Sequence, residues 1–169
     1  MRRLVTSVIL LVAAAVSVRA AVDPAPEPKG GKVYIYKETA GVPQEMEIYF
    51  PPDWNPQKRT HPAIILFHGG GWGNGSLSAF RYQCEYFASR GLVAVTANYT
   101  LAKKQSESPE GQSRKRVCIT DAKSAIRWLK AHATELGIDP TRLIAGGGSA
   151  GGHISMLATH NPELNDPQD

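Results

Sequence analysis

The stretch Leu143-Ile144-Ala145-Gly146-Gly147-Gly148-Ser149-Ala150-Gly151-Gly152-His153 decides the fold of this chain. Residues 143–145 are apolar and predict a buried strand, and residues 154–158 can continue as a helix. Between them, Gly147-x-Ser149-x-Gly151 has the spacing of a sharp strand-to-helix turn that holds a serine in a strained backbone conformation. The serine oxygen then lies above the sheet at a helix N-terminus, whose amides stabilise negative charge. The stretch therefore predicts a nucleophile elbow at Ser149.

Two other hypotheses fit the same letters. Gly146-x-Gly148-x-x-Gly151 is the dinucleotide-binding fingerprint, which also needs a strand before it and a helix after it. A glycine-rich turn with a purely structural role is the third hypothesis. The rest of the chain has to distinguish a nucleophile from a phosphate-binding turn and from a structural turn.

The length and composition predict one globular domain with an export signal. The 169 residues allow a single ordinary domain, and 42% hydrophobic residues are typical of a folded chain. Arg2-Arg3 precede an apolar run over residues 4–18, and Val18-Arg19-Ala20 places small residues where a signal peptidase reads. This run is shorter than the ~20 residues that span a bilayer, so we expect no stable membrane anchor. Residues 1–20 are therefore a predicted signal peptide, cleaved between Ala20 and Ala21, and the protein is expected to be secreted or periplasmic.

The net charge predicts no nucleic-acid partner. The chain carries +4 at neutral pH, but the predicted signal peptide holds three of its 19 basic residues and no acidic one. The remaining 16 basic and 15 acidic residues nearly balance, so the charge is no evidence for binding a polyanion.

The two cysteines, Cys84 and Cys118, fit no metal-binding spacing. Two thiols cannot complete a tetrahedral site by themselves, so we expect no metal centre. In an oxidising compartment, a disulfide between them and a pair of buried free thiols remain two open alternatives.

Strands and helices alternate along residues 32–169, after a proline- and glycine-rich leader over residues 21–31. Residues 32–37 and 45–50 predict two antiparallel strands, and the continuous apolar run in His61–Phe67 predicts a central strand buried on both faces. Three strand–helix alternations then predict an α/β fold, with a mostly parallel sheet, flanking helices and right-handed crossovers. The other expected elements are helices near 76–90 and 120–136, a strand at 92–97 and a turn at Asp139-Pro140-Thr141.

A second glycine-rich motif, His68-Gly69-Gly70-Gly71, directly follows the predicted central strand. Open α/β sheets place their ligand sites at the carboxyl ends of such strands. Three glycines let the backbone approach a substrate carbonyl and turn its N–H groups toward the oxyanion that forms when a nucleophile attacks an ester. Together with the serine 81 positions after His68, this motif favours the nucleophile hypothesis.

From Tyr34 to Ile154 the chain resembles the front half of an α/β-hydrolase of the hormone-sensitive-lipase-like and acetyl-esterase type. Four motifs carry the resemblance: His68-Gly69-Gly70-Gly71-Trp72, Asp121-Ala122-Lys123-Ser124-Ala125-Ile126-Arg127-Trp128-Leu129, Gly137-Ile138-Asp139-Pro140 and Gly148-Ser149-Ala150-Gly151-Gly152-His153. The resemblance implies Ser149 as the acyl-forming nucleophile and an oxyanion hole built from N–H groups, with no cofactor and no metal. The oxyanion donors would be Gly70, Gly71 and Ala150, and the residues supporting the two motifs would be His68, Gly69, Gly147 and Gly151.

The sequence departs from the family pattern at two places. Thr100, in Asn98-Tyr99-Thr100-Leu101, stands where the family often has an arginine with a structural contact. The family's acid and histidine follow the serine by many tens of residues, whereas Asp169 lies 20 residues after Ser149. We therefore expect residues 32–169 to be the N-terminal part of an α/β-hydrolase domain, truncated after the elbow strand and helix, and inactive or weak as an enzyme by itself.

The histidines in the chain are not expected to replace the missing base. His153 follows the serine by one helical turn, where such esterases usually have a histidine that is not their base. His160 lies roughly 16 Å along the same helix at 1.5 Å per residue, which is too far to take the serine's proton. His68 is expected to fix the shape of its glycine motif, and His132 lies away from the strand ends.

The function expected from these residues is an exported carboxylic-ester hydrolase acting on small acyl esters. Acetyl or feruloyl esters of a polysaccharide are a substrate class suggested by analogy alone. The alternative is a catalytically inactive hydrolase-like remnant or binding protein. A dinucleotide-binding domain is disfavoured, because its glycine fingerprint is expected after the first strand, and here two buried strands precede the glycines.

Overall fold

The structure, a computed structural model, describes residues 29–104, 107–109 and 112–165. The predicted signal peptide, the leader up to residue 28, and Asp166 and Asp169 lie outside the described residues. In chain order the elements are β1 (Lys32–Thr39), β2 (Val42–Tyr49), β3 (His61–Phe67), η1 (Leu77–Phe80), α1 (Arg81–Ser89), β4 (Val93–Ala97), α2 (Arg114–Ala131), α3 (Ala133–Leu136), β5 (Ile138–Gly147), α4 (Ala150–His160) and η4 (Pro162–Leu164).

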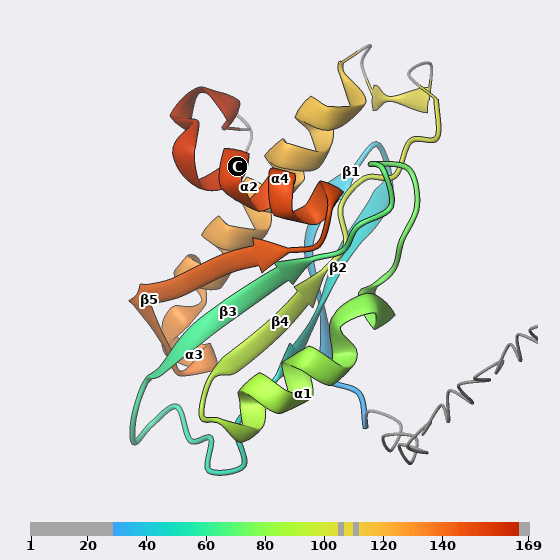
Figure 1. Cartoon of the computed structure of the whole chain (residues 1–169). Coiled ribbons are helices and arrows are strands. Elements are labelled where there is room, and N and C mark those ends of the chain that lie inside the picture. The colour runs from blue at the N-terminus through green and yellow to red at the C-terminus, as the bar shows by residue number, and fades with distance from the viewer. Residues whose placement is uncertain (1–28, 105–106, 110–111, 166–169) are drawn as a thin grey trace, which may run out of the picture.

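One mixed sheet contains all five strands in the order β1-β2-β4-β3-β5 (Figure 1). The hairpin of β1 and β2 is antiparallel, as predicted, and β2 also pairs antiparallel with β4. β3 lies between β4 and β5 and is parallel to both. The glycine motif after β3 and the elbow after β5 therefore leave the sheet at the same end, side by side.

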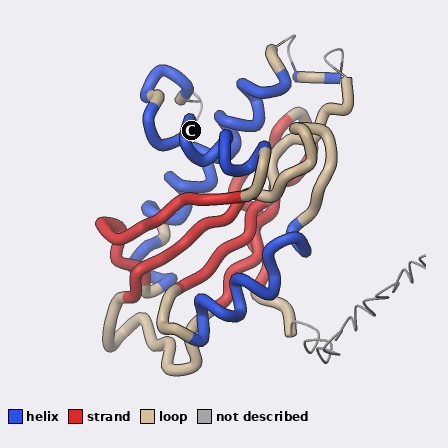
Figure 2. Tube along the Cα trace, viewed as in Figure 1, coloured by secondary structure: helices blue, strands red, loops and turns tan. Residues whose placement is uncertain are grey.

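Helices cover both faces of this sheet (Figures 1 and 2). Successive strand residues point to opposite faces, so Ala63, Ile65 and Phe67 of β3 pack under α2 and α4, while Ile64 and Leu66 pack under α1. The larger hydrophobic core lies on the α2 and α4 side. β3 is buried on both faces, as its continuous apolar run predicts.

Several predicted boundaries were wrong, including that of β2, which was expected over 45–50 and is Val42–Tyr49. The helix expected over 76–90 is divided into η1 and α1, and the helix expected over 120–136 begins at Arg114 and is divided at His132 into α2 and α3. β5 begins at Ile138 rather than after the predicted turn, because residues 139–142 form an irregularity inside the strand. The pairing moves from His61–Ile138 directly to Ala63–Leu143, and the Asp139 carboxylate accepts a hydrogen bond from the Thr141 N–H.

The two cysteines are free and buried, so the disulfide alternative is wrong. Cys84 belongs to the core on the α1 side of the sheet and Cys118 to the core on the α2 side, so the sheet separates them. Across the described ranges, no helix is long and apolar enough to span a membrane. The same residues contain no cluster of three histidine, cysteine or acidic side chains that could hold a metal.

Candidate active site

A tight turn places Ser149 between the end of β5 and the start of α4. Its backbone has φ 50° and ψ −117°, a conformation that a residue with a Cβ atom adopts only under strain. The turn is closed by the Gly151 N–H, which donates to the Gly148 carbonyl at 2.8 Å. The Gly148 N–H donates to the carbonyl of Phe67 at 3.3 Å and so ties the turn to the end of β3. Ser149 is exposed, as a nucleophile must be.

Two glycines of this turn are required by packing against β3. A Cβ atom on either Gly147 or Gly151 would overlap the carbonyl oxygen of Phe67. Gly148 is different, because a Cβ atom there would meet only the Phe80 ring at an ordinary 3.6 Å. The required positions are those of Gly-x-Ser-x-Gly. The middle glycine of the dinucleotide fingerprint has room for a side chain, so the geometry favours the elbow over that fingerprint.

The second glycine motif forms the loop over residues 68–75, which we name the glycine loop. Gly70, Gly71 and Trp72 have successive positive φ values of 120°, 62° and 64°. The Gly70 carbonyl accepts hydrogen bonds from the N–H groups of Gly73 and Asn74 at 3.2 and 3.1 Å, which closes a turn. The positive φ values explain why glycine follows glycine in this motif.

The glycine loop lies directly against the elbow. A Cβ atom on Gly69 would be 3.4 Å from the Cβ atom of Ser149. Within the described residues, the N–H groups of Gly70, Gly71 and Ala150 donate no hydrogen bond, although many neighbouring amides do. Ala150 is also the first residue of α4, where the helix dipole favours negative charge. The arrangement can therefore receive an oxyanion beside the serine hydroxyl.

His68 is buried in the wall of the glycine loop and helps to fix its shape. Its Nδ1 lies 2.8 Å from the Gly69 carbonyl oxygen, and its ring stacks on Tyr99 at 4.4 Å between centroids. The Tyr99 hydroxyl donates to the His68 carbonyl at 2.7 Å. Burial raises the pKa of Tyr99, with the neighbouring Cys118 adding to the shift, so the hydroxyl remains a donor. Tyr99 was not predicted as a site residue, since no local sequence pattern links it to a histidine 31 positions earlier.

Three further histidines contact groups other than the serine hydroxyl. His153 packs edge-on against Trp72 at 5.7 Å, and the same indole ring lies 4.7 Å from the Lys115 ammonium group. His160 Nδ1 lies 2.9 Å from the Met156 carbonyl oxygen. His132 stacks on Trp128 at 3.9 Å.

Known proteins are similar to this chain in sequence. The model of the family described as BD-FAE matches residues 46–167. Carboxylesterase NlhH of Mycobacterium tuberculosis is 33% identical over 125 residues, which cover 73% of this chain and 37% of that protein. The probable carboxylic ester hydrolase LipM of the same organism is 32% identical over 129 residues, covering 76% and 27%.

Solved structures of an esterase from Thermogutta terrifontis are also similar. The propionate-bound Est2 structure has a TM-score of 0.76 and 44% identity, covering 85% of this chain and 50% of that one. The structure of esterase 2 phosphorylated by paraoxon has a TM-score of 0.75 and 43% identity, covering 85% and 53%. This chain therefore spans about half the length of the solved structures and about a third of the curated relatives.

Proposed function

The chain belongs to the BD-FAE family and has the α/β-hydrolase fold, and on this premise we propose that it supplies the nucleophile and the oxyanion hole of a carboxylic-ester hydrolase. The observation that carries the proposal is the approach of the glycine loop to the elbow, with Gly69 against Ser149. Ser149 is exposed, and within the described residues three backbone N–H groups near it donate no hydrogen bond. These N–H groups belong to Gly70, Gly71 and Ala150.

The proposed reaction begins with attack of the Ser149 oxygen on the ester carbonyl carbon. The serine proton passes to a general base, and the carbonyl oxygen becomes an oxyanion that accepts hydrogen bonds from the three amides. The C–O bond to the alcohol then breaks, the alcohol leaves with that proton, and an acyl-serine remains. Attack of water on the acyl-serine releases the acid and restores the serine hydroxyl.

We place the general base and its orienting acid outside residues 29–165. The five histidines, at positions 61, 68, 132, 153 and 160, all contact other groups, and within the described residues the Ser149 hydroxyl makes no hydrogen bond. The matched structures are about twice as long as the aligned region, which leaves room in them for further catalytic residues. By itself, the 169-residue chain should hydrolyse p-nitrophenyl acetate negligibly, because an unactivated serine keeps its proton at neutral pH.

The substrate proposed is a small acyl ester. A propionate-bound structure of the Thermogutta terrifontis esterase supports short acyl groups for that relative. We extend this to acetyl or feruloyl esters of a polysaccharide, a class that suits the predicted export through residues 1–20 to a secreted or periplasmic location.

The test is covalent labelling in a chimera in which residues 29–165 replace the matching part of the Thermogutta terrifontis esterase. A fluorophosphonate should label the chimera on the peptide containing Ser149, and Ser149→Ala should remove both labelling and turnover. Ser155→Ala is the matched control, because the Ser155 hydroxyl donates to the Gly152 carbonyl on the buried side of the same helix. Labelling that persists in Ser149→Ala would refute the nucleophile. A folded chimera that is never labelled would favour the inactive, binding-protein alternative.

A further inference from the structure

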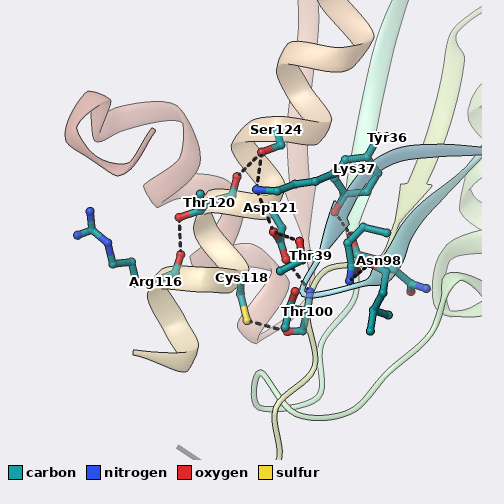
Figure 3. A network of polar contacts seen from close by, with 12 residues as sticks. Tyr36, Lys37, Thr39, Asn98, Thr100, Arg116, Cys118, Thr120, Asp121 and Ser124 are labelled. Carbon is teal, nitrogen blue, oxygen red and sulfur yellow. Dashed lines mark hydrogen bonds and ion pairs between the residues drawn. The ribbon is translucent and has the colours of Figure 1, made fainter. Parts of the chain in front are cut away.

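Asp121, on α2, is a buried carboxylate whose three partners come from β1 and from the segment after β4 (Figure 3). The Thr39 hydroxyl at the end of β1 donates to Oδ1 at 3.1 Å. The Thr100 N–H donates to Oδ2 at 2.8 Å. The Lys37 ammonium group lies 3.5 Å from Oδ1, with its side chain only 13% exposed. A buried carboxylate requires this kind of compensation, because desolvation of an unpaired charge is costly.

The cation of this cluster comes from an unexpected element. By the family resemblance of the sequence, Thr100 stands where an arginine is often found, and it offers Asp121 only a backbone N–H. Lys37 reaches the carboxylate from β1, and it also donates to the Ser124 hydroxyl at 3.3 Å. β1 lies before residue 46, where the match to the family model begins.

The same cluster holds the backbone on both sides of Tyr99. The Tyr36 hydroxyl on β1 donates to the Asn98 carbonyl at 2.8 Å, and the Cys118 thiol on α2 donates to the Thr100 carbonyl at 3.2 Å (Figure 3). The Asn98 N–H donates to the Glu45 carbonyl on β2 at 2.9 Å. Residues 98 and 100 are therefore fixed by the N-terminal hairpin and α2.

Tyr99, between these two fixed residues, points to the glycine loop. It donates to the His68 carbonyl and stacks on the His68 ring. We propose that Lys37 is a positioning residue for the glycine loop: it neutralises Asp121, Asp121 holds Thr100, and the fixed backbone around Thr100 lets Tyr99 hold His68. The N-terminal hairpin thereby contributes to the geometry of the oxyanion donors. That this positioning matters for catalysis rests on the proposed function. The effect of Lys37 on the glycine loop itself does not depend on it.

The test measures amide hydrogen exchange in the full 169-residue chain at submicromolar concentration, so it is independent of any esterase activity. Lys37→Met removes the charge and keeps the apolar stem. We expect about tenfold faster exchange in the peptide covering residues 68–75, because a support of that loop is lost, and no change in the α1 peptide on the other face of the sheet. Lys32→Met on the same strand is the control, because the Lys32 ammonium group contacts only the Tyr34 ring in the described structure.

A second variant moves the positive charge from residue 37 to residue 100, and its hydrogen exchange is compared with that of Lys37→Met. In Lys37→Met combined with Thr100→Arg, the new guanidinium starts beside Asp121 and should restore slow exchange in residues 68–75. If Lys37→Met does not fold, Thr39→Val removes a single Asp121 hydrogen bond and should accelerate the same peptide by about twofold to threefold. The proposal is overturned if residues 68–75 exchange as in Lys32→Met, if the α1 peptide accelerates equally, or if Thr100→Arg fails to restore protection.

Discussion

Gly151, in the first turn of α4, lies so close to Phe67 at the end of β3 that the two backbones are in contact. A Cβ atom on Gly151 would overlap the Phe67 carbonyl oxygen and would lie 2.7 Å from the carbonyl oxygen of His68. This contact fixes the elbow relative to the glycine loop, because Phe67 is the residue from which that loop departs. The distance between the serine and the oxyanion donors therefore depends on residue 151 having no Cβ atom.

Gly151→Ala should consequently destabilise the protein by about 3 kcal/mol or more, at the upper end of overpacking costs. This loss should appear even though alanine is the better helix former by about 1 kcal/mol. Gly148→Ala is the matched control in the same turn and should cost less than about 1 kcal/mol, since its Cβ atom meets only the Phe80 ring at 3.6 Å. Denaturant unfolding of both variants measures the difference. Equal stabilities would contradict the contact.

Much of the site could be predicted because its steric demands are local. The backbone at Gly147 and Gly151 approaches the end of β3 too closely for a Cβ atom. Only glycine fits such a position, so the residue type itself indicates the close approach. The same reasoning predicted β3 over His61–Phe67, where burial on both faces produces an unbroken apolar run. The observed pairing of β3 with β5 then brings the two predicted glycine motifs together.

The remaining features could not be predicted, either because they depend on residues far apart in the sequence or because the local sequence favours a different structure. α2 begins with Arg114-Lys115-Arg116, three cations at the helix end that favours anions, and Ser113 before them makes no side-chain capping bond. Ser76, directly before η1, also makes no side-chain capping bond, and its hydroxyl shares a hydrogen bond with the Ser78 hydroxyl. Lys37 and Asp121 are 84 positions apart, and the packing of α2 against β1 brings them together.

Ser149→Gly should be more stable than Ser149→Ala, although both lack the nucleophile. The φ of 50° at this residue strains any side chain with a Cβ atom, and glycine removes that strain. The expected difference is about 1 kcal/mol, because the added flexibility of glycine in the unfolded chain offsets part of the gain. Thermal unfolding of the two variants, compared in the chimera, measures it. A less stable Ser149→Gly would show that the elbow is not strained.

Gly71→Ala should slow turnover of the chimera while leaving it folded. A Cβ atom at residue 71 meets nothing within 4 Å, so only the positive φ of 62° opposes it. The resulting shift of one oxyanion donor should reduce kcat on the order of 10²–10³-fold. Gly70→Ala is the contrasting variant, because its Cβ atom would overlap the Asn74 carbonyl and should unfold the turn itself. Unchanged kcat in Gly71→Ala would remove residue 71 from the oxyanion hole.

The two thiols should be inert in the folded protein. Burial, followed by the charge of Glu47, raises the pKa of Cys84 to about 12. Burial, followed by the charge of Asp121, raises the pKa of Cys118 to about 12. At pH 8 only about one thiol in 10⁴ is then ionised, and the thiolate is the reactive form. Reaction with a chromogenic disulfide reagent should therefore be negligible until denaturant is added, when both cysteines should react. Rapid modification under native conditions would contradict the burial of either thiol.

The two edges of the sheet differ in how well they resist pairing with another chain. β1 forms one edge and carries the exposed charges of Lys32 and Glu38, which discourage strand addition. β5 forms the other edge, and its segment from Leu143 to Gly147 contains no charge. Ile144 on this segment is 55% exposed, since α1 contacts β2 and β4 rather than β5. An uncharged edge with an exposed β-branched side chain is a template for association.

Residues 29–165 expressed alone should therefore self-associate at micromolar concentrations through β5. Ile144→Lys places a charge on the exposed face of that edge and should shift the protein toward monomer in sedimentation velocity. Ile35→Lys is the matched control, because Ile35 is equally exposed, at 58%, but lies on the edge that already carries charges. It should leave the association unchanged, since the association does not use β1. A monomeric parent protein, or an equal effect of the two lysines, would show that the β5 edge does not drive association.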